Sequence, residues 1–192
     1  APPPAALTAA PVDAAPPERS LARLTSAWGG GVRAHGLSGI GAQPYVGVGG
    51  ELVVHVRREI VFAELAFSLW RPSGLQIQPG SPDHLMVGLD AAALRVGTRP
   101  TALPLRGWLV AEAGALVHAG AMLEQPGAMT WVSVGAGFGV EWPLASYLRL
   151  VGTIELVVPL NRARFALSNG ADLYEPDPVC ARSGIGLEVG WP

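Results

Sequence analysis

Apolar and polar positions alternate along eight separate stretches of the chain between residues 26 and 191. Side chains of a β-strand point to its two faces in turn, so a period of two predicts strands. The expected strands are 26–36, 44–56, 60–70, 85–96, 105–118, 130–142, 146–158 and 181–191. Clusters of Gly, Pro, Asn and Asp separate them, which is typical of turns. No window shows a helical spacing of apolar residues, so the pattern predicts an all-β protein.

In each predicted strand one face is aliphatic, and the other holds glycine, small residues and isolated charges. The fourth strand, for example, sets Leu85, Val87, Leu89, Ala91 and Ala93 opposite Gly88, Asp90 and Ala92. A soluble barrel would need its aliphatic face inside and many charges outside. The glycine-rich face carries too few charges for a wet surface. We therefore interpret it as a narrow lumen, and the aliphatic face as facing lipid.

Charged side chains on the predicted lumen face should pair, because an unpaired charge in a confined space is costly. The expected network contains Arg33, Glu51, Glu64, Asp90, Arg106, Glu112, Glu141, Arg149, Glu155, Arg182 and Glu188. Eight strands enclose a space only just wide enough for side chains, so we expect these pairs to plug the barrel. Arg95 falls on the lipid face by the same alternation, near a strand end where it can reach water.

Tryptophans partly support a membrane location. Trp28, Trp142 and Trp191 fall on the lipid face near one set of strand ends, as in an interfacial girdle. Trp70 and Trp131 point inward by alternation, unless a bulge shifts their register.

Composition supports the same architecture. Hydrophobic residues make up 49% of the chain and charged residues 15%, against about 25% charged in a typical soluble domain. No stretch approaches the roughly 18 apolar residues that a membrane-spanning helix needs. The net charge of -2 gives no reason to expect a nucleic-acid partner. The single Cys180 excludes an internal disulfide, and we expect a free thiol in a loop.

The chain divides into an Ala/Pro-rich leader, residues 1–24, and a barrel, residues 25–192. The leader lacks aromatic residues and periodicity, so we expect it to be flexible and periplasmic. No signal peptide is visible, and we take the start as processed or trimmed, with export inferred from the rest. If the N-terminus is periplasmic, the longest outer loop is Leu160 to Cys180, with Phe165, Leu173 and Tyr174 as expected contact residues.

The eight alternating segments and the final strand, Ile185 to Trp191, resemble small bacterial outer-membrane barrels of the OmpA-like and OmpX-like kind. The stretch Val157 to Phe165 is similar to the penultimate strand of barrels from myxobacteria and their relatives. The resemblance implies a Gram-negative outer-membrane protein. Such families often end on a terminal aromatic residue, whereas this chain ends Trp191-Pro192.

Signs of chemistry are few. His35, His55 and His118 share the predicted lumen face, either as members of its polar network or as a small ion or proton site. Some barrels of this kind are lipid A enzymes that use Ser, His and an acid, for which Ser133, His118 and Glu112 are candidates. No metal motif, nucleotide-binding loop or cofactor signature is present.

We therefore expect a monomeric outer-membrane barrel, in contact with outer-membrane lipid, with a structural or surface-interaction role. Its loops would meet an unknown extracellular or periplasmic partner. Three alternatives remain open: a narrow, porin-like channel, a soluble lipocalin-type barrel that binds a ligand, and an enzyme that modifies envelope lipids.

Overall fold

A computed structural model describes residues 28–76, 84–100, 103–119, 127–162, 164–166 and 172–191. The predicted leader, residues 1–24, lies outside the described residues. In the part of the chain that is described, no helix is long and apolar enough to cross a membrane.

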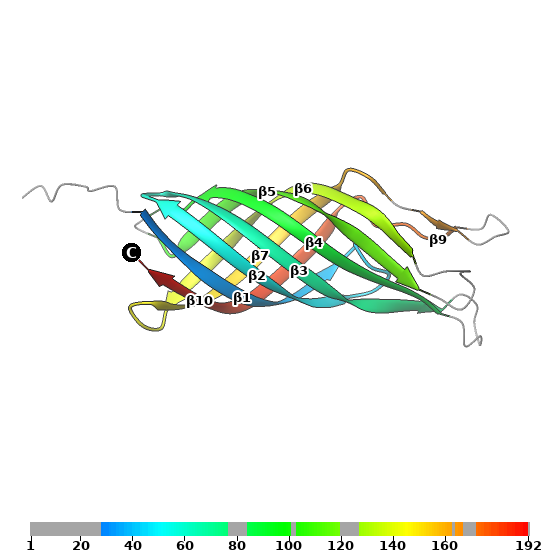
Figure 1. Ribbon diagram of the computed structural model, residues 1–192, viewed down its shortest axis with the longest axis horizontal. Helices are drawn as coiled ribbons and strands as arrows, with labels where there is room; N and C mark the ends of the chain where they lie inside the picture. The colour runs from blue at the N-terminus through cyan, green and yellow to red at the C-terminus, as the bar shows by residue number, and fades with distance from the viewer. Residues whose placement is uncertain are drawn as a thin grey trace, which may run out of the picture.

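Eight antiparallel strands close into a barrel (Figure 1). They are β1 (Trp28–Ile40), β2 (Gly47–Arg58), β3 (Val61–Gln76), β4 (His84–Thr98), β5 (Leu105–Ala119), β6 (Gly127–Pro143), β7 (Leu148–Pro159) and β10 (Cys180–Trp191). Each strand pairs with its sequence neighbours, and β10 pairs with both β7 and β1. Closure satisfies the backbone of the first and last strands, which a bilayer requires because it offers no hydrogen-bonding water. The predicted eight-stranded fold is confirmed.

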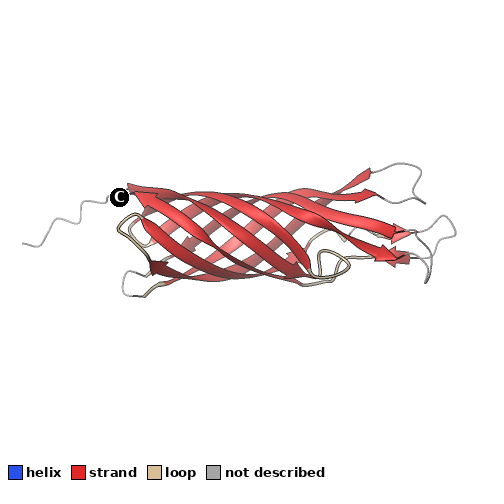
Figure 2. Cartoon of the chain, turned by 90° about the horizontal axis from the view of Figure 1, so that it is seen from below, coloured by secondary structure: helices blue, strands red, loops and turns tan. Residues whose placement is uncertain are grey.

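Strand β1 starts, and strand β10 finishes, at the same end of the barrel, here called the terminal end (Figure 1). Residues 59–60, 99–104 and 144–147 connect strands there. The opposite end, here called the loop end, is where β1, β3, β5 and β7 end; Figure 2 shows the two ends of the barrel from a second side. The described connection 41–46 and the described parts of the longest connection, 160–179, lie there. The longest connection is therefore at the loop end, as the sequence predicts.

Burial alternates along the barrel strands with the period of two that the sequence predicts. On β2, Val54 and Val56 are about half exposed, whereas Glu51, Val53 and His55 are buried. The wall of the barrel is a single β-sheet, so each side chain points either into the lumen or outward. The buried side chains therefore fill the lumen, and the exposed ones form an apolar outer surface. This outer surface gives the fold of a transmembrane barrel, and it rules out the lipocalin-type interpretation, which needs the aliphatic residues inside.

The predicted faces of β4 are wrong. Leu85, Val87 and Leu89 are buried in the lumen, with Arg95 on the same face at 4% exposure, and Asp90 is exposed on the outside. An aliphatic side chain is removed from water both in a dry lumen and in lipid, and both environments stabilise the protein. Aliphatic character alone therefore does not tell the two faces of a strand apart. The charge of Arg95 determines which face of β4 points inward, because carboxylates can pair with it inside the barrel but not in the hydrocarbon of the bilayer.

An apolar layer fills the lumen near the loop end. It contains Trp70, Leu85, Val87, Leu89, Leu116 and Trp131, all buried. The inward direction that alternation predicts for Trp70 and Trp131 is thus confirmed, with Trp131 fully buried. A register shift does occur in β3, but it lies between Trp70 and Ser73 and leaves Trp70 facing inward.

A second sheet, absent from the predicted elements, lies in the longest connection. It pairs β8 (Phe165–Ala166) with β9 (Asp172–Tyr174). The Tyr174 hydroxyl donates a hydrogen bond of 3.2 Å to the carbonyl of Gly41, which ties this sheet to the connection between β1 and β2.

Candidate functional site: the ion pairs of the lumen

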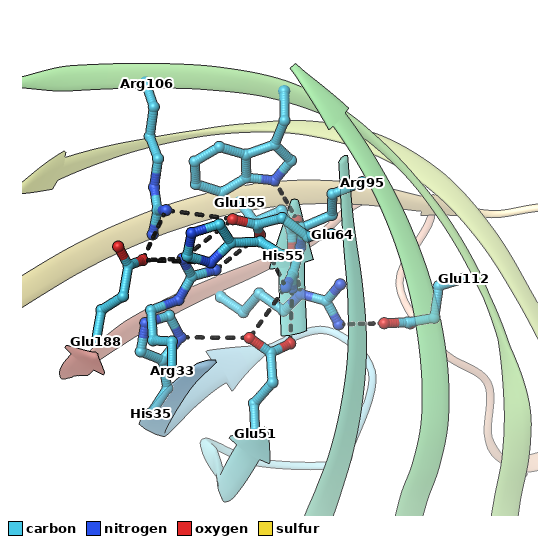
Figure 3. Close-up of polar contacts among 12 residues, drawn as sticks. Arg33, His35, Glu51, His55, Glu64, Arg95, Arg106, Glu112, Glu155 and Glu188 are labelled. Carbon is cyan, nitrogen blue, oxygen red and sulfur yellow. Dashed lines mark hydrogen bonds and ion pairs between the residues drawn. The ribbon is translucent and has the colours of Figure 1, made fainter. Parts of the chain in front are cut away.

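Arg95 of β4 holds the centre of the lumen. Its guanidinium donates to both carboxylate oxygens of Glu51 on β2, at 3.0 and 2.7 Å. It also donates to both carboxylate oxygens of Glu155 on β7, at 2.9 and 3.2 Å. Figure 3 shows these groups meeting across the barrel from different parts of the wall. One side chain therefore joins three strands that do not neighbour each other in the sheet.

The network continues from Glu155 toward the loop end. Arg182 pairs with Glu155 and, at 2.6 Å, with Glu112 of β5. The indole N–H groups of Trp108 and Trp131 donate to Glu155 and Glu112, each at 2.6 Å. These charge-assisted hydrogen bonds offset part of the cost of burying the carboxylates.

A second group of ion pairs lies toward the terminal end. Arg33 of β1 donates to Glu64 at 2.7 and 3.1 Å and to Glu188 at 3.0 Å. Arg106 approaches the same two carboxylates through Nη1, at 3.2 and 3.3 Å (Figure 3). Two further pairs close this end: Arg149 with Glu188 at 3.0 Å, and Arg99 with Glu141 at 2.9 Å.

Every predicted lumen residue except Asp90 faces inward and takes part in at least one ion pair. Asp90 faces outward, a consequence of the reversed faces of β4. Sequence reasoning missed Arg95, Arg99 and Trp108 as members of the network. The sequence did hold a signal for Arg95, since a charged residue at a position assigned to lipid indicates that the two faces of the strand have been assigned the wrong way round.

Glycines on the inward face make room for the larger members of the network. A Cβ atom on Gly137 would lie 2.6 Å from the Trp108 ring, and one on Gly31 would lie 2.6 Å from Cε1 of His55. Both distances are shorter than side chains tolerate. The glycine-rich face of the sequence is therefore the space that the network occupies.

The three histidines on the lumen face do not form a common site. His35 contacts Glu51 at 3.3 Å, His55 lies 3.8 Å from Glu188, and His118 packs edge-on against Phe165. No cluster of His, Cys, Asp and Glu suited to a metal ion occurs among the residues that the structure describes. For His35 and His55 the geometry fits membership of the polar network, whereas His118 packs against an aromatic ring outside it.

The serine, histidine and acid considered for lipid chemistry are only partly assembled. Ser133 donates to Glu112 at 3.3 Å, but Ser133 is fully buried in the lumen, away from the lipid surface. The ring contact found for His118 is with Phe165, not with Ser133. This trio therefore lacks both the geometry of a nucleophile with its base and access to a lipid substrate.

Phe165, Leu173 and Tyr174 belong to the small sheet at the loop end. The Phe165 ring is 5% exposed and stacks on Tyr174 at 6.0 Å between ring centres. Burial raises the pKa of the Tyr174 hydroxyl above its usual value. Leu173 is part of β9, and its side chain lies outside the described set. Of the three, Phe165 is thus mainly a packing residue within the loop.

Open space within the described lumen is small. Two cavities of about 20 Å³ lie toward the two ends, and one of about 10 Å³ lies between Arg33, Arg95 and Arg182. Each has room for about one water molecule.

Similar structures are known, although no protein-family model and no curated protein matches the chain. A major outer membrane protein from Thermus thermophilus superposes with a TM-score of 0.64 at 13% identity, over 86% of this chain and 100% of that one. Ail, the attachment invasion locus protein of Yersinia pestis, solved with the heparin analogue sucrose octasulfate, superposes with a TM-score of 0.51. Its identity is 12%, over 85% of this chain and 98% of that one.

The chain has the fold of the small bacterial outer-membrane barrels. The predicted resemblance is confirmed at the level of the fold. The apolar outer surface agrees with it independently, since such a surface is stable in a bilayer and not in water.

Proposed function

We propose that this protein is an outer-membrane barrel whose own Glu/Arg network closes its lumen, and whose role is structural or surface-interacting. One observation carries the proposal: Arg95 bridges Glu51 and Glu155 across the barrel, with all three side chains at most 5% exposed. A guanidinium held by four hydrogen bonds occupies the space that a permeating ion would need. The apolar layer of Trp70, Leu89 and Trp131 adds a second barrier at the loop end.

Conductance in planar lipid bilayers tests closure. We expect the purified protein, inserted from detergent, to give no stable current steps in molar potassium chloride. An unheated sample that migrates differently from a boiled one on an SDS gel would show that the protein was folded. Reproducible current steps from such folded protein would overturn the proposal in favour of the narrow channel.

We further propose that the loop end carries the surface interaction, and that the terminal end faces the periplasm. Longer loops face outward in barrels of this class. The β8–β9 sheet is held by the bond from Tyr174 to Gly41 and by ion pairs of Arg162 and Arg164 with Glu175, at 3.1 and 3.3 Å. Residues held in place in this way lose less conformational entropy when a partner binds than unconstrained residues do.

Deletion of residues 166–177 tests the surface role. Cells that express the shortened protein should attach to glass and to one another less than cells that express the full chain. The gel shift of unheated protein should be unchanged, since the deleted residues lie outside the barrel strands. Equal attachment of the two strains, at equal surface levels, would argue for a purely structural role.

A further inference from the structure

The ion pairs of the lumen fall into two clusters. The cluster toward the loop end contains Glu51, Glu112 and Glu155 with Arg95 and Arg182. The cluster toward the terminal end contains Glu64, Glu141 and Glu188 with Arg33, Arg99, Arg106 and Arg149. Among the described residues one contact joins them, from Nη1 of Arg95 to Glu64 at 3.9 Å.

The two clusters carry opposite formal charge when histidine is counted as neutral. Three carboxylates face two guanidinium groups toward the loop end, and three face four toward the terminal end. Arg57 adds one more positive charge at the terminal end, where no ion pair is found for it within the described chain. Glu59 also borders this mouth, but it lies exposed on a turn, where water screens its charge.

Arg57 lies close to charged groups of both signs at this mouth. Its side chain lies over Gly29, where a Cβ atom would come within 2.7 Å of its Nε. Arg99 and Arg149 repel its charge, and Glu141 and Glu188 attract it. Two arginines that repel each other at the mouth of a low-dielectric lumen are stabilised when an anion lies between them.

Arg106, which also lines the cavity at this end, has hydrogen-bond donors that the described residues leave without an acceptor. Its side chain is 3% exposed, and its Nη1 approaches Glu64, Glu141 and Glu188 at 3.2, 3.6 and 3.3 Å. Its Nε and Nη2 have no hydrogen-bond acceptor in the described structure. A buried N–H group without an acceptor destabilises the fold, and this one belongs to a charged group.

A cavity of about 20 Å³ at the terminal end is lined by Arg57, Arg99, Arg106, His55, Glu141 and Glu188, among others. We propose that this mouth binds a small phosphate-type oxyanion, held by Arg57, Arg99 and Arg106. The planar guanidinium group matches the oxygens of such an anion with two parallel hydrogen bonds. The enclosed volume holds about one water molecule, so the anion would lie at the opening of the cavity, where Arg57 and Arg99 are partly exposed. Its source is either free phosphate or the phosphate of a lipid headgroup.

Calorimetric titration of the folded protein in detergent with inorganic phosphate tests the site, in a chloride buffer of constant ionic strength at neutral pH. The decisive variant is Arg57→Gln, and its matched control is Arg58→Gln. Both remove one positive charge from the end of β2, but Arg58 is exposed and stacks on Trp28 outside the lumen. Wild type and the control should bind phosphate, and Arg57→Gln should weaken binding about tenfold or more.

Absence of saturable binding to the wild type, or equal weakening by the two variants, would overturn the site. If Arg57→Gln fails to show the gel shift of a folded barrel, Arg99→Gln takes its place, with the same expectation. A parallel titration with short-chain phosphatidic acid, and with short-chain phosphatidylcholine for comparison, identifies the source. Tighter binding of phosphatidic acid than of inorganic phosphate assigns the site to a lipid headgroup, and the reverse assigns it to the free anion.

Discussion

Arg95 shows how one side chain stabilises a barrel from within. It lies on β4 but binds Glu51 of β2 and Glu155 of β7, so its contacts cross the lumen rather than follow the sheet. The buried carboxylates depend on it, because neither water nor lipid can replace a guanidinium in that space. Stability at the residue scale therefore depends on complete pairing more than on any individual bond.

Replacing Arg95 with Met should strongly destabilise the barrel. The change keeps much of the side-chain length but leaves the buried Glu51 without its arginine partner, and Glu155 with one arginine in place of two, at a cost of about 3–5 kcal/mol. The measurement is the free energy of unfolding by urea in lipid vesicles, followed by tryptophan fluorescence. Arg71→Met is the control, because Arg71 is exposed at the loop end. Similar losses for the two variants would contradict the role given to Arg95.

Trp131 contributes a hydrogen bond that a smaller aromatic side chain at the same position cannot make. Trp131→Phe eliminates the indole N–H that Glu112 accepts at 2.6 Å, and should lower the free energy of unfolding by about 1.5–3 kcal/mol. Trp142→Phe is the matched control, since Trp142 is half exposed on the outer surface. Vesicle unfolding of both variants decides the prediction, and it is wrong if they differ by less than the error of the measurement.

At the scale of elements, the connection between β1 and β2 helps to organise the loop ends of β3 and β4. Gln43 is 5% exposed, and its side-chain amide donates to the carbonyls of Arg71 and Val87, each at 3.0 Å. These carbonyls lie where the β3–β4 register shifts, between Trp70 and Ser73. The amide therefore supplies hydrogen bonds at a point where the regular ladder is interrupted.

Gln43→Ala should loosen this region and leave the rest of the barrel unchanged. We expect faster backbone hydrogen exchange at residues 71–76 and 84–89, because the two carbonyls lose their donor. Residues 61–66 of the same β3 strand serve as the internal reference. Exchange that rises equally in both halves of β3 would indicate global destabilisation and contradict a local role for Gln43.

At the scale of the whole molecule, a single β-sheet separates an apolar outer surface from a charged lumen. Leu94 and Asp90 both face outward on β4, yet one is aliphatic and the other charged. The charge of Asp90, closer to the loop end, marks where the apolar band gives way to the water interface, since carboxylates avoid the bilayer interior. Position along the barrel, as well as face, thus sets which residues are tolerated.

Arginine scanning of β4 tests this arrangement. Leu94→Arg should lower the free energy of unfolding in vesicles by about 2–4 kcal/mol, as for a charge near the bilayer midplane. Asp90→Arg, on the same strand and face, should cost about 1 kcal/mol or less. The reverse order of the two effects would show that the apolar band is placed wrongly along the barrel axis.

The alternation of apolar and polar residues was enough to predict the number of barrel strands, their approximate bounds and the inward face of each of them except β4. This follows because a period of two reports directly which side chains share an environment. Tertiary structure alone decided the faces of β4, where leucines and valines fill the lumen and Arg95 lies among them. It also decided which carboxylate each arginine binds and how Gln43 and the β8–β9 sheet are placed. These features depend on contacts between strands far apart in the chain, and burial stabilises an apolar side chain equally well in lipid and in a packed lumen.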